Sequence, residues 1–235
     1  MTLAAAVGIM CKAPVPGVTK TRLGAFIGAD HACALSACFL RDVAAAIIDI
    51  PPALGAKGYG VYAPAGTEQA LRAILPPSFD LLLQSDSDFG NVLHGAMCKL
   101  LEGGHDCVLL VNGDSPTLPS QYLSQAITEL RRQGDRMILG PASDGGYYLI
   151  GLKAPHRELF ESIPWSTGDV ASRTIESAER ADLEIVLLPE WYDVDDAESF
   201  QCLRDELSGN SLWYKTGNAA PATRKYLAAL AVPVT

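Results

Sequence analysis

The segment KAPVPGVTKTRL, residues 12–23, follows directly on Leu3–Met10, an apolar run with the length of a buried strand. Its two prolines and its glycine predict an irregular loop, into which Lys12, Lys20 and Arg22 bring three cations. Cations on a preshaped loop at the carboxyl end of a strand suit a diphosphate, because arginine binds phosphate oxygens in pairs and lysine supplies a point charge. The GxxxxGK(S/T) spacing of a P-loop is absent. We therefore predict a phosphate-binding loop; a solvated loop with ordinary surface charges is the alternative.

Strand-length apolar runs alternate with helical periodicity along the rest of the chain. The predicted strands are Gly58–Ala63, Phe79–Gln84, Cys107–Asn112, Arg136–Gly140, Tyr147–Leu152 and Leu183–Leu188. The predicted helices cover 32–47, 71–75, 92–100, 123–130 and 168–181, with further helices after residue 195 and in APATRKYLAAL, residues 220–230. The turn-rich PASDGG, residues 141–146, predicts an antiparallel hairpin. Alternation of this kind predicts right-handed crossovers and one three-layer α/β/α domain over residues 1–235, with a mainly parallel mixed sheet.

The composition of the chain limits which binding partners and which cellular location we expect for the protein. The chain has 235 residues, of which 49% are hydrophobic, and a formal net charge of −9. This negative charge disfavours nonspecific binding to nucleic acid, because phosphate backbones bind to clusters of Lys and Arg. The six cysteines are scattered without CxxC spacing, as in reduced cytosolic proteins. The N-terminus lacks the basic region of a signal peptide, and no apolar run approaches the ~20 residues of a membrane span. We expect a soluble, cytoplasmic protein without a membrane span; the sequence does not indicate its oligomeric state.

Motifs of two common enzyme classes are absent. The four histidines show no metal-ligand spacing, and neither GxSxG nor GxGxxG occurs. These absences argue against a hydrolase with a covalent triad and against a nicotinamide-dependent enzyme.

An aspartate closes the fourth predicted strand, in VNGDSPTLP at residues 111–119. Ligands of open parallel sheets bind at the carboxyl ends of the strands, so Asp114 is well placed for chemistry. A divalent cation prefers carboxylate oxygen and keeps other positions for water and substrate phosphate. We interpret Asp114 as a metal ligand; an Asx turn to its own backbone is the alternative.

Two later segments carry further acidic residues. In GPASDGGYYLIGL, residues 140–152, Asp144 precedes two glycines, which fits a functional site and an Asp-Gly turn equally well. In WYDVDDAESF, residues 191–200, two aspartates at positions 193 and 195 share a face of an extended segment and suit a second metal contact. Asp195 with Glu198 also matches a capping box for the final helix, and we interpret Ser166 with Asp169 as another helix cap.

Taken together, these segments resemble a bacterial family of glycosyltransferase-like proteins catalogued as a domain of unknown function, within the nucleotide-diphospho-sugar transferase superfamily of GT-A fold. The resemblance rests on KAPVPGVTKTRL, NGDSPTLP, GPASDGGYYLIGL, IPWSTGDV, YDVDDAESF and APATRKYLAAL, and so covers nearly the whole chain. It implies a GT-A fold and a nucleotide-linked substrate bound with Mg²⁺ or Mn²⁺.

The resemblance also implies roles for single residues. The nucleotide would contact Lys12, Gly17, Lys20, Thr21 and Arg22, together with Gly90 and Asn91 of DFGNVLHGA. The metal would be held by Asp114 and Asp195, and Asp144 would face the sugar or acceptor.

The sequence departs from the family pattern at three places. Asn112 replaces the first acid of the usual Asp-x-Asp metal motif, which leaves only Asp114. Asp196 and Ala197 replace the usual Thr-Pro of the last motif, and Val92 stands where a basic residue is expected.

We hypothesise a metal-dependent glycosyl transfer from a nucleotide-diphospho-sugar, with Asp114 and Asp144 as the catalytic residues and Asp144 as general base. The same fold also supports nucleotidyl transfer from a nucleoside triphosphate with release of pyrophosphate. A third hypothesis is a noncatalytic nucleotide-sugar-binding protein, since the first acid of the metal motif is missing.

Overall fold

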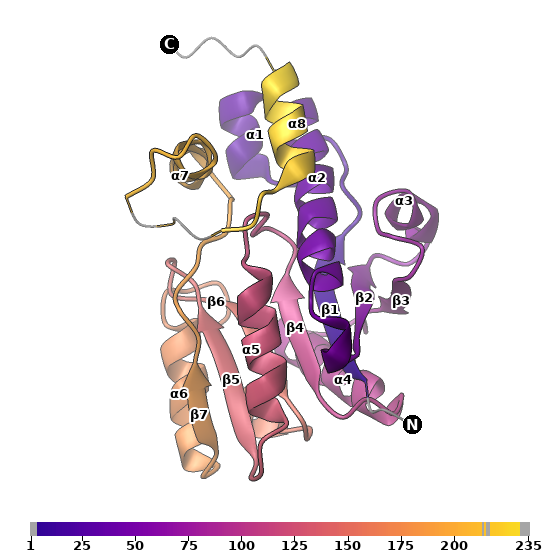
Figure 1. Ribbon diagram of the computed structural model, residues 1–235, viewed down its shortest axis with the longest axis vertical. Helices are drawn as coiled ribbons and strands as arrows, with labels where there is room; N and C mark the ends of the chain where they lie inside the picture. The colour runs from indigo at the N-terminus through magenta and orange to yellow at the C-terminus, as the bar shows by residue number, and fades with distance from the viewer. Residues whose placement is uncertain (1–3, 213, 215–216, 231–235) are drawn as a thin grey trace.

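The computed structural model describes residues 4–212, 214 and 217–230, which form one seven-stranded sheet with helices on both faces (Figure 1). The strand order is β3-β2-β1-β4-β6-β5-β7. All neighbouring strands are parallel except β6, which is antiparallel to both β4 and β5. The strands are β1 Ala5–Lys12, β2 Ala56–Ala63, β3 Asp80–Leu83, β4 Val108–Asn112, β5 Arg136–Pro141, β6 Tyr147–Leu152 and β7 Glu184–Leu187. The predicted mainly parallel mixed sheet and its hairpin are confirmed.

Within the described residues, eight α-helices connect and cover these strands. They are α1 Thr21–Ile27, α2 Ala29–Ile48, α3 Glu68–Arg72, α4 Phe89–Glu102, α5 Ser120–Leu130, α6 Val170–Arg180, α7 Ala197–Leu207 and α8 Pro221–Ala229. Two short 3-10 turns, η1 Pro52–Leu54 and η2 Arg157–Leu159, lie between them. Helices α2 and α5 lie side by side over one face of the sheet in Figure 1, and α4 and α6 cover the other.

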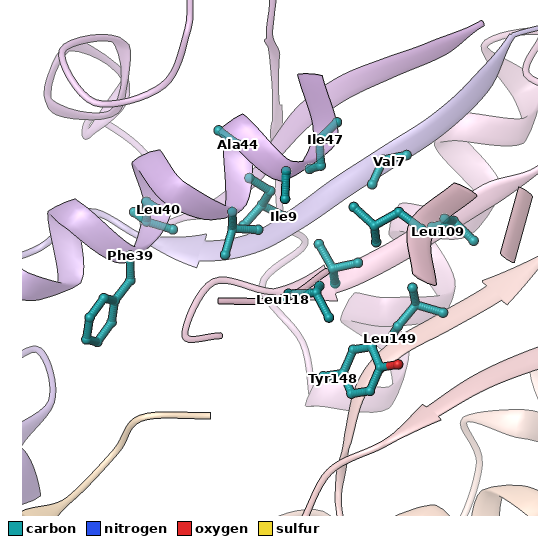
Figure 2. Close-up of a cluster of buried hydrophobic side chains, with 14 of the residues drawn as sticks. Val7, Ile9, Phe39, Leu40, Ala44, Ile47, Leu109, Leu118, Tyr148 and Leu149 are labelled. Atoms are coloured by element: carbon teal, nitrogen blue, oxygen red, sulfur yellow. The ribbon is translucent and has the colours of Figure 1, made fainter. Parts of the chain in front are cut away.

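Alternation along the strands divides the core into two clusters, one on each face of the sheet. In β1, Val7 and Ile9 face α2, and Figure 2 shows them beneath Ala44 and Ile47. The neighbouring Ala6 belongs to the opposite cluster, with residues of α4 and α6. Because both faces are covered by helices, the central strands are continuous apolar runs in the sequence and do not alternate between apolar and polar residues.

Helix α2 corrects the expectation that no apolar segment approaches the length of a membrane span. It has 20 residues, and its mean hydropathy of 1.5 makes it long and apolar enough to cross a membrane. In the fold it is a core helix that packs on β1, β2 and α8. It also contains Asp42, whose buried carboxylate accepts backbone hydrogen bonds from Ala222 and Thr223 at the start of α8. Its apolar character is therefore explained by burial inside the protein.

The structure differs from the predicted elements in smaller ways. The loop at 12–23 is shorter than predicted, because α1 begins at Thr21; the helix runs to Ile27 and is followed by its C-cap Gly28, a glycine with φ 94°. Helix α3 lies a few residues earlier than the predicted 71–75. Leu3, the predicted start of the first strand, lies outside the described residues.

The topology identifies the edge of the sheet where a ligand can bind. From β1 the chain continues outward to β2 and β3, and then crosses back to place β4 on the other side of β1. The carboxyl ends of β1 and β4 therefore flank the switch point of the sheet, where open α/β folds bind their ligands. The cation-bearing loop follows β1, and Asp114 follows β4.

Candidate active site at the switch point

The loop cations and the acidic residues meet at the switch point. Lys20 Nζ lies 2.9 Å from Asp114 Oδ1 and 2.7 Å from Asp195 Oδ1. Arg22, which is in the first turn of α1, donates from Nη2 to Asp195 Oδ2 at 2.9 Å. Segments separated by more than 170 residues thus form one charged cluster, as the sequence predicted.

Lys20 is held in an unusual backbone conformation. It is the residue before α1 and has φ 51° and ψ 52°, in the left-handed region that non-glycine residues avoid. Its side chain is only 4% exposed. Burial alone would lower the pKa of Lys20, but the charges of Asp114 and Asp195 and hydrogen bonds to them raise it above its ordinary value. The ammonium group is therefore a fixed positive charge between two carboxylates.

Two hydrogen bonds hold the end of β4 against the segment that carries Asp195. The backbone N–H of Val194 donates to the carbonyl oxygen of Asp114 at 2.9 Å. The hydroxyl of Ser115, which is fully buried, donates to the carbonyl oxygen of Tyr192 at 2.7 Å. The sequence interpretation treated Ser115 only as part of a turn, whereas the structure uses it to fix the distance between the two acidic segments.

Asp193 lies close to the same cluster. Burial, followed by the charges of Asp195, Asp144 and Asp114, raises the pKa of Asp193 to about 6. Asp195, Asp144 and Asp114 therefore each lie within electrostatic range of Asp193. Alternation with Asp195 was the only sequence signal for Asp193.

Both helix caps predicted near the site are wrong. The N-cap of α7 is Asp196, which accepts a hydrogen bond from the backbone of Ser199 while the Ser199 hydroxyl bonds back to the N-cap backbone. Asp195 is therefore not used by the cap and is available to the site. Ser166 does not cap α6: it has φ 66° and lines the cleft, and Asp169 at the start of α6 makes no side-chain cap bond.

A cleft of about 670 Å³ opens beside the charged cluster. Its polar lining includes Arg22, Asp195, Asp144 and Asn112. The carboxylate of Asp144 also accepts the backbone N–H of Gly146 at 2.8 Å, so the turn and the functional interpretations of Asp144 hold together.

The cleft is also lined by aromatic side chains that the sequence interpretation did not include. Phe89 and Trp165 pack edge to face with ring centroids 5.0 Å apart, and Tyr147 approaches Trp165 at 6.4 Å. We call these three residues the aromatic wall. The motifs DFGNVLHGA and IPWSTGDV contain two of them, but only the fold brings the two motifs together.

The remaining predicted nucleotide contacts are spread along the loop and α4. Lys12 is the exposed last residue of β1, and Gly17 has φ 74° with open space around it. Thr21 is the first residue of α1. Gly90 and Asn91 line a second, smaller cavity of about 400 Å³ rather than the main cleft.

Gly90 and Asn91 have structural roles where they stand. A Cβ atom on Gly90 would lie 2.3 Å from the carbonyl oxygen of Phe160, so the glycine lets α4 pack against that segment. The backbone N–H of Asn91 donates to Asp88, the N-cap of α4, and its side-chain oxygen accepts from Arg157. Their contact with a nucleotide stays a prediction.

The donor set at the switch point suits a hard divalent cation. Asp114 and Asp195 supply carboxylate oxygens, and Asn112 Oδ1 is buried at the cleft without a hydrogen-bond partner among the described residues. Oxygen ligands of this kind are preferred by Mg²⁺ and Mn²⁺. Within residues 4–212, 214 and 217–230, no three acidic, histidine or cysteine side chains enclose a metal on their own. A metal here would need oxygens from the substrate or water.

Comparison with known proteins identifies the family. Residues 49–167 match the family described as "Uncharacterized protein conserved in bacteria (DUF2064)". The chain belongs to this family. A protein of Desulfovibrio desulfuricans G20, provisionally classed as a nucleotide-diphospho-sugar transferase, is 30% identical, with a TM-score of 0.82 and 95% of each chain covered. No curated protein matches the sequence.

More distant structures share the fold alone. CMP:2-keto-3-deoxy-manno-octonic acid synthetase, solved with CTP, is 12% identical with a TM-score of 0.55, over 88% of this chain and all of the other. Glucosyl-3-phosphoglycerate synthase of Mycobacterium tuberculosis, solved with Mn²⁺, UDP and its product, is 10% identical with a TM-score of 0.51, over 89% and 78% of the two chains. The fold of the protein is thus that of nucleotide-diphospho-sugar transferases.

Proposed function

We propose that this protein is a transferase that moves a glycosyl group from a nucleotide-diphospho-sugar to an acceptor hydroxyl, with Mg²⁺ or Mn²⁺. One observation carries the proposal: Lys20 and Arg22 meet Asp114 and Asp195 at the switch point, beside an open cleft. Cations and metal-binding carboxylates at one point are what a diphosphate leaving group requires.

The donor diphosphate would lie between the loop after β1 and the end of β4. Lys20 and Arg22 would bind its oxygens, with Gly17 and Thr21 on the same loop. A divalent cation held by Asp114 and Asp195 would neutralise charge on the leaving group. Each contact made mainly in the transition state contributes on the order of 2–4 kcal/mol.

Asp144 is the proposed general base. In the transfer, the acceptor oxygen forms a bond to the anomeric carbon, the bond from that carbon to the diphosphate oxygen breaks, and the nucleoside diphosphate leaves with the electron pair. The acceptor proton would pass to Asp144, which lines the cleft and is held by the Gly146 N–H.

Calorimetry with nucleoside diphosphates and Mn²⁺ tests the proposal. We expect Asp114→Ala to abolish the metal-dependent part of nucleotide binding; binding that is unchanged would refute the role of Asp114.

Turnover assays distinguish the three candidate functions. Release of nucleoside diphosphate from a nucleotide sugar supports glycosyl transfer, whereas release of pyrophosphate from a triphosphate selects nucleotidyl transfer. Binding without any turnover would select a noncatalytic sensor.

A further inference from the structure

The lining of the cleft combines two kinds of chemistry. Arg22, Asp144 and Asp195 contribute charge, next to Lys20. The remainder is lined mainly by the aromatic wall and by aliphatic side chains: Met10, Leu93, Leu110, Val111, Ile150 and Val170. Only the charged residues suit a diphosphate, so the apolar lining is left for the second substrate.

The rings of the aromatic wall pack against one another and are partly exposed. Phe89 is 48% exposed although it is a large apolar side chain at the start of α4. Its ring meets Trp165 at an interplanar angle of 87°, and Tyr147 meets Trp165 at 75°. Trp165 is held by two contacts. Its backbone N–H donates to the carbonyl of Ile163, and its ring lies against Gly90. An exposed ring held in this way offers a ready surface for a ring or an apolar face of a ligand.

The charges of the cleft exclude an anionic second substrate. Among the described residues that line it, Arg22 is the single cation, against the carboxylates of Asp144 and Asp195. Arg22 is already paired with Asp195 and would serve the donor diphosphate. Since the donor diphosphate would also occupy Lys20 and the metal, a phosphorylated acceptor would find no further cation among the described residues that line the cleft, and unpaired charge in a cleft is costly.

From these observations we infer that the acceptor is an uncharged alcohol or sugar whose ring or apolar face packs on Phe89 and Trp165, and not a phosphorylated metabolite. The inference rests on the proposed function, because only a transferase has an acceptor, and it assigns the apolar lining of the same cleft to that acceptor. The acceptor hydroxyl would then point to Asp144.

The test compares two probes that share one aromatic ring, using the full chain with the donor site filled by a nucleoside diphosphate and Mn²⁺. One is neutral p-nitrophenyl β-D-glucopyranoside, and the other is anionic p-nitrophenyl phosphate. By calorimetry we expect the neutral probe to bind more tightly, and its affinity to fall about tenfold in Trp165→Ala and in Phe89→Ala, as for loss of one aromatic contact. Trp165→Phe should keep most of the affinity. Phe26→Ala is the matched control, because Phe26 is exposed and packs edge to face on Phe200 outside the cleft.

Any of three results would overturn the inference. The first is equal or tighter binding of the phosphate probe. The second is binding of the neutral probe that is the same in Trp165→Ala as in the wild type. The third is a loss of nucleoside diphosphate affinity in Trp165→Ala as large as the loss for the neutral probe, since the aromatic wall would then serve the nucleobase. Failure of the proposed function is distinct: no nucleotide would bind at all, while the comparison of the two probes would still give its answer.

Discussion

Lys20 Nζ lies 2.9 Å from Oδ1 of Asp114, so a positive charge of the chain itself stands beside the carboxylate predicted to hold a metal. The same ammonium is 2.7 Å from Asp195, the second predicted ligand. A divalent cation and this ammonium cannot both be close to the two carboxylates without strong repulsion. A substrate diphosphate relieves that repulsion, because its oxygens can bind both cations at once.

The first prediction concerns metal binding in the absence of nucleotide. Lys20→Met removes the charge and keeps the length of the side chain, so we expect Mn²⁺ alone to bind at least about tenfold more tightly than to the wild type. Nucleoside diphosphate binding should weaken in the same variant, because a phosphate partner is lost. Electron paramagnetic resonance of free Mn²⁺ measures the first effect and calorimetry the second.

A lysine in an exposed pair provides the control for that experiment. Lys57 pairs with Asp80 on the strands β2 and β3, and Lys57→Met should leave Mn²⁺ affinity unchanged. Mn²⁺ affinity that stays the same or falls in Lys20→Met would mean that Lys20 and the metal do not compete for these carboxylates.

The second prediction concerns the turn that carries Asp144. Gly145 has φ 87°, and a Cβ atom there would lie 2.1 Å from the carbonyl oxygen of Gly168. We expect Gly145→Ala to lower the free energy of unfolding by about 3 kcal/mol or more, since it combines backbone strain with a backbone clash. Gly66 has nearly the same φ, 86°, but open space around it, so Gly66→Ala should cost only about 1–2 kcal/mol. Urea denaturation compares the two variants. Equal losses in the free energy of unfolding would show that the clash with Gly168 does not destabilise the Gly145→Ala variant.

The sequence predicted the sheet and the charged cluster because both depend on local signals. Apolar runs predict strands, and cations or carboxylates at their ends predict a site where the strands meet. What the sequence did not predict depends on long-range packing. The aromatic wall needs α4 and the segment before α6 to lie together, which no single motif reports. Helix α1 was missed because TRLGAFI is short and the residue before it, Lys20, is in the left-handed region.

The third prediction uses pH to test the contact between α2 and α8. Asp42 is 2% exposed and accepts the backbone N–H groups of Ala222 and Thr223 at 2.9 and 2.8 Å. Burial raises the pKa of Asp42 above its ordinary value of 3.8, although these hydrogen bonds oppose the rise. The folded protein therefore holds this proton more tightly than the unfolded chain does. Its contribution to stability is complete below about pH 4 and is lost as the pH rises through the folded-state pKa.

Comparison with Asp42→Asn isolates that contribution, because the variant cannot titrate at this position. We expect the stability of the wild type relative to Asp42→Asn to be greatest near pH 3 and to decline as the pH is raised to 7. Thermal unfolding of both proteins at a series of pH values gives the difference. A difference that grows with pH would show that the hydrogen bonds from α8, and not burial, dominate at Asp42.

The fourth prediction separates the cap of α7 from the metal site beside it. Asp196 accepts the Ser199 N–H at 3.0 Å, and Ser199 Oγ accepts the N–H groups of both Asp195 and Asp196. Asp196→Ala should therefore lower the free energy of unfolding by about 1 kcal/mol, the usual cost of losing an N-cap. Glu198→Ala should change it by less than about 0.5 kcal/mol, because Glu198 makes no cap bond here. Asp195→Ala should instead abolish Mn²⁺-dependent nucleotide binding, since its carboxylate faces Lys20 rather than the helix. If Asp195→Ala and Asp196→Ala affected nucleotide binding equally, the two neighbouring aspartates would not have the separate roles that their hydrogen bonds indicate.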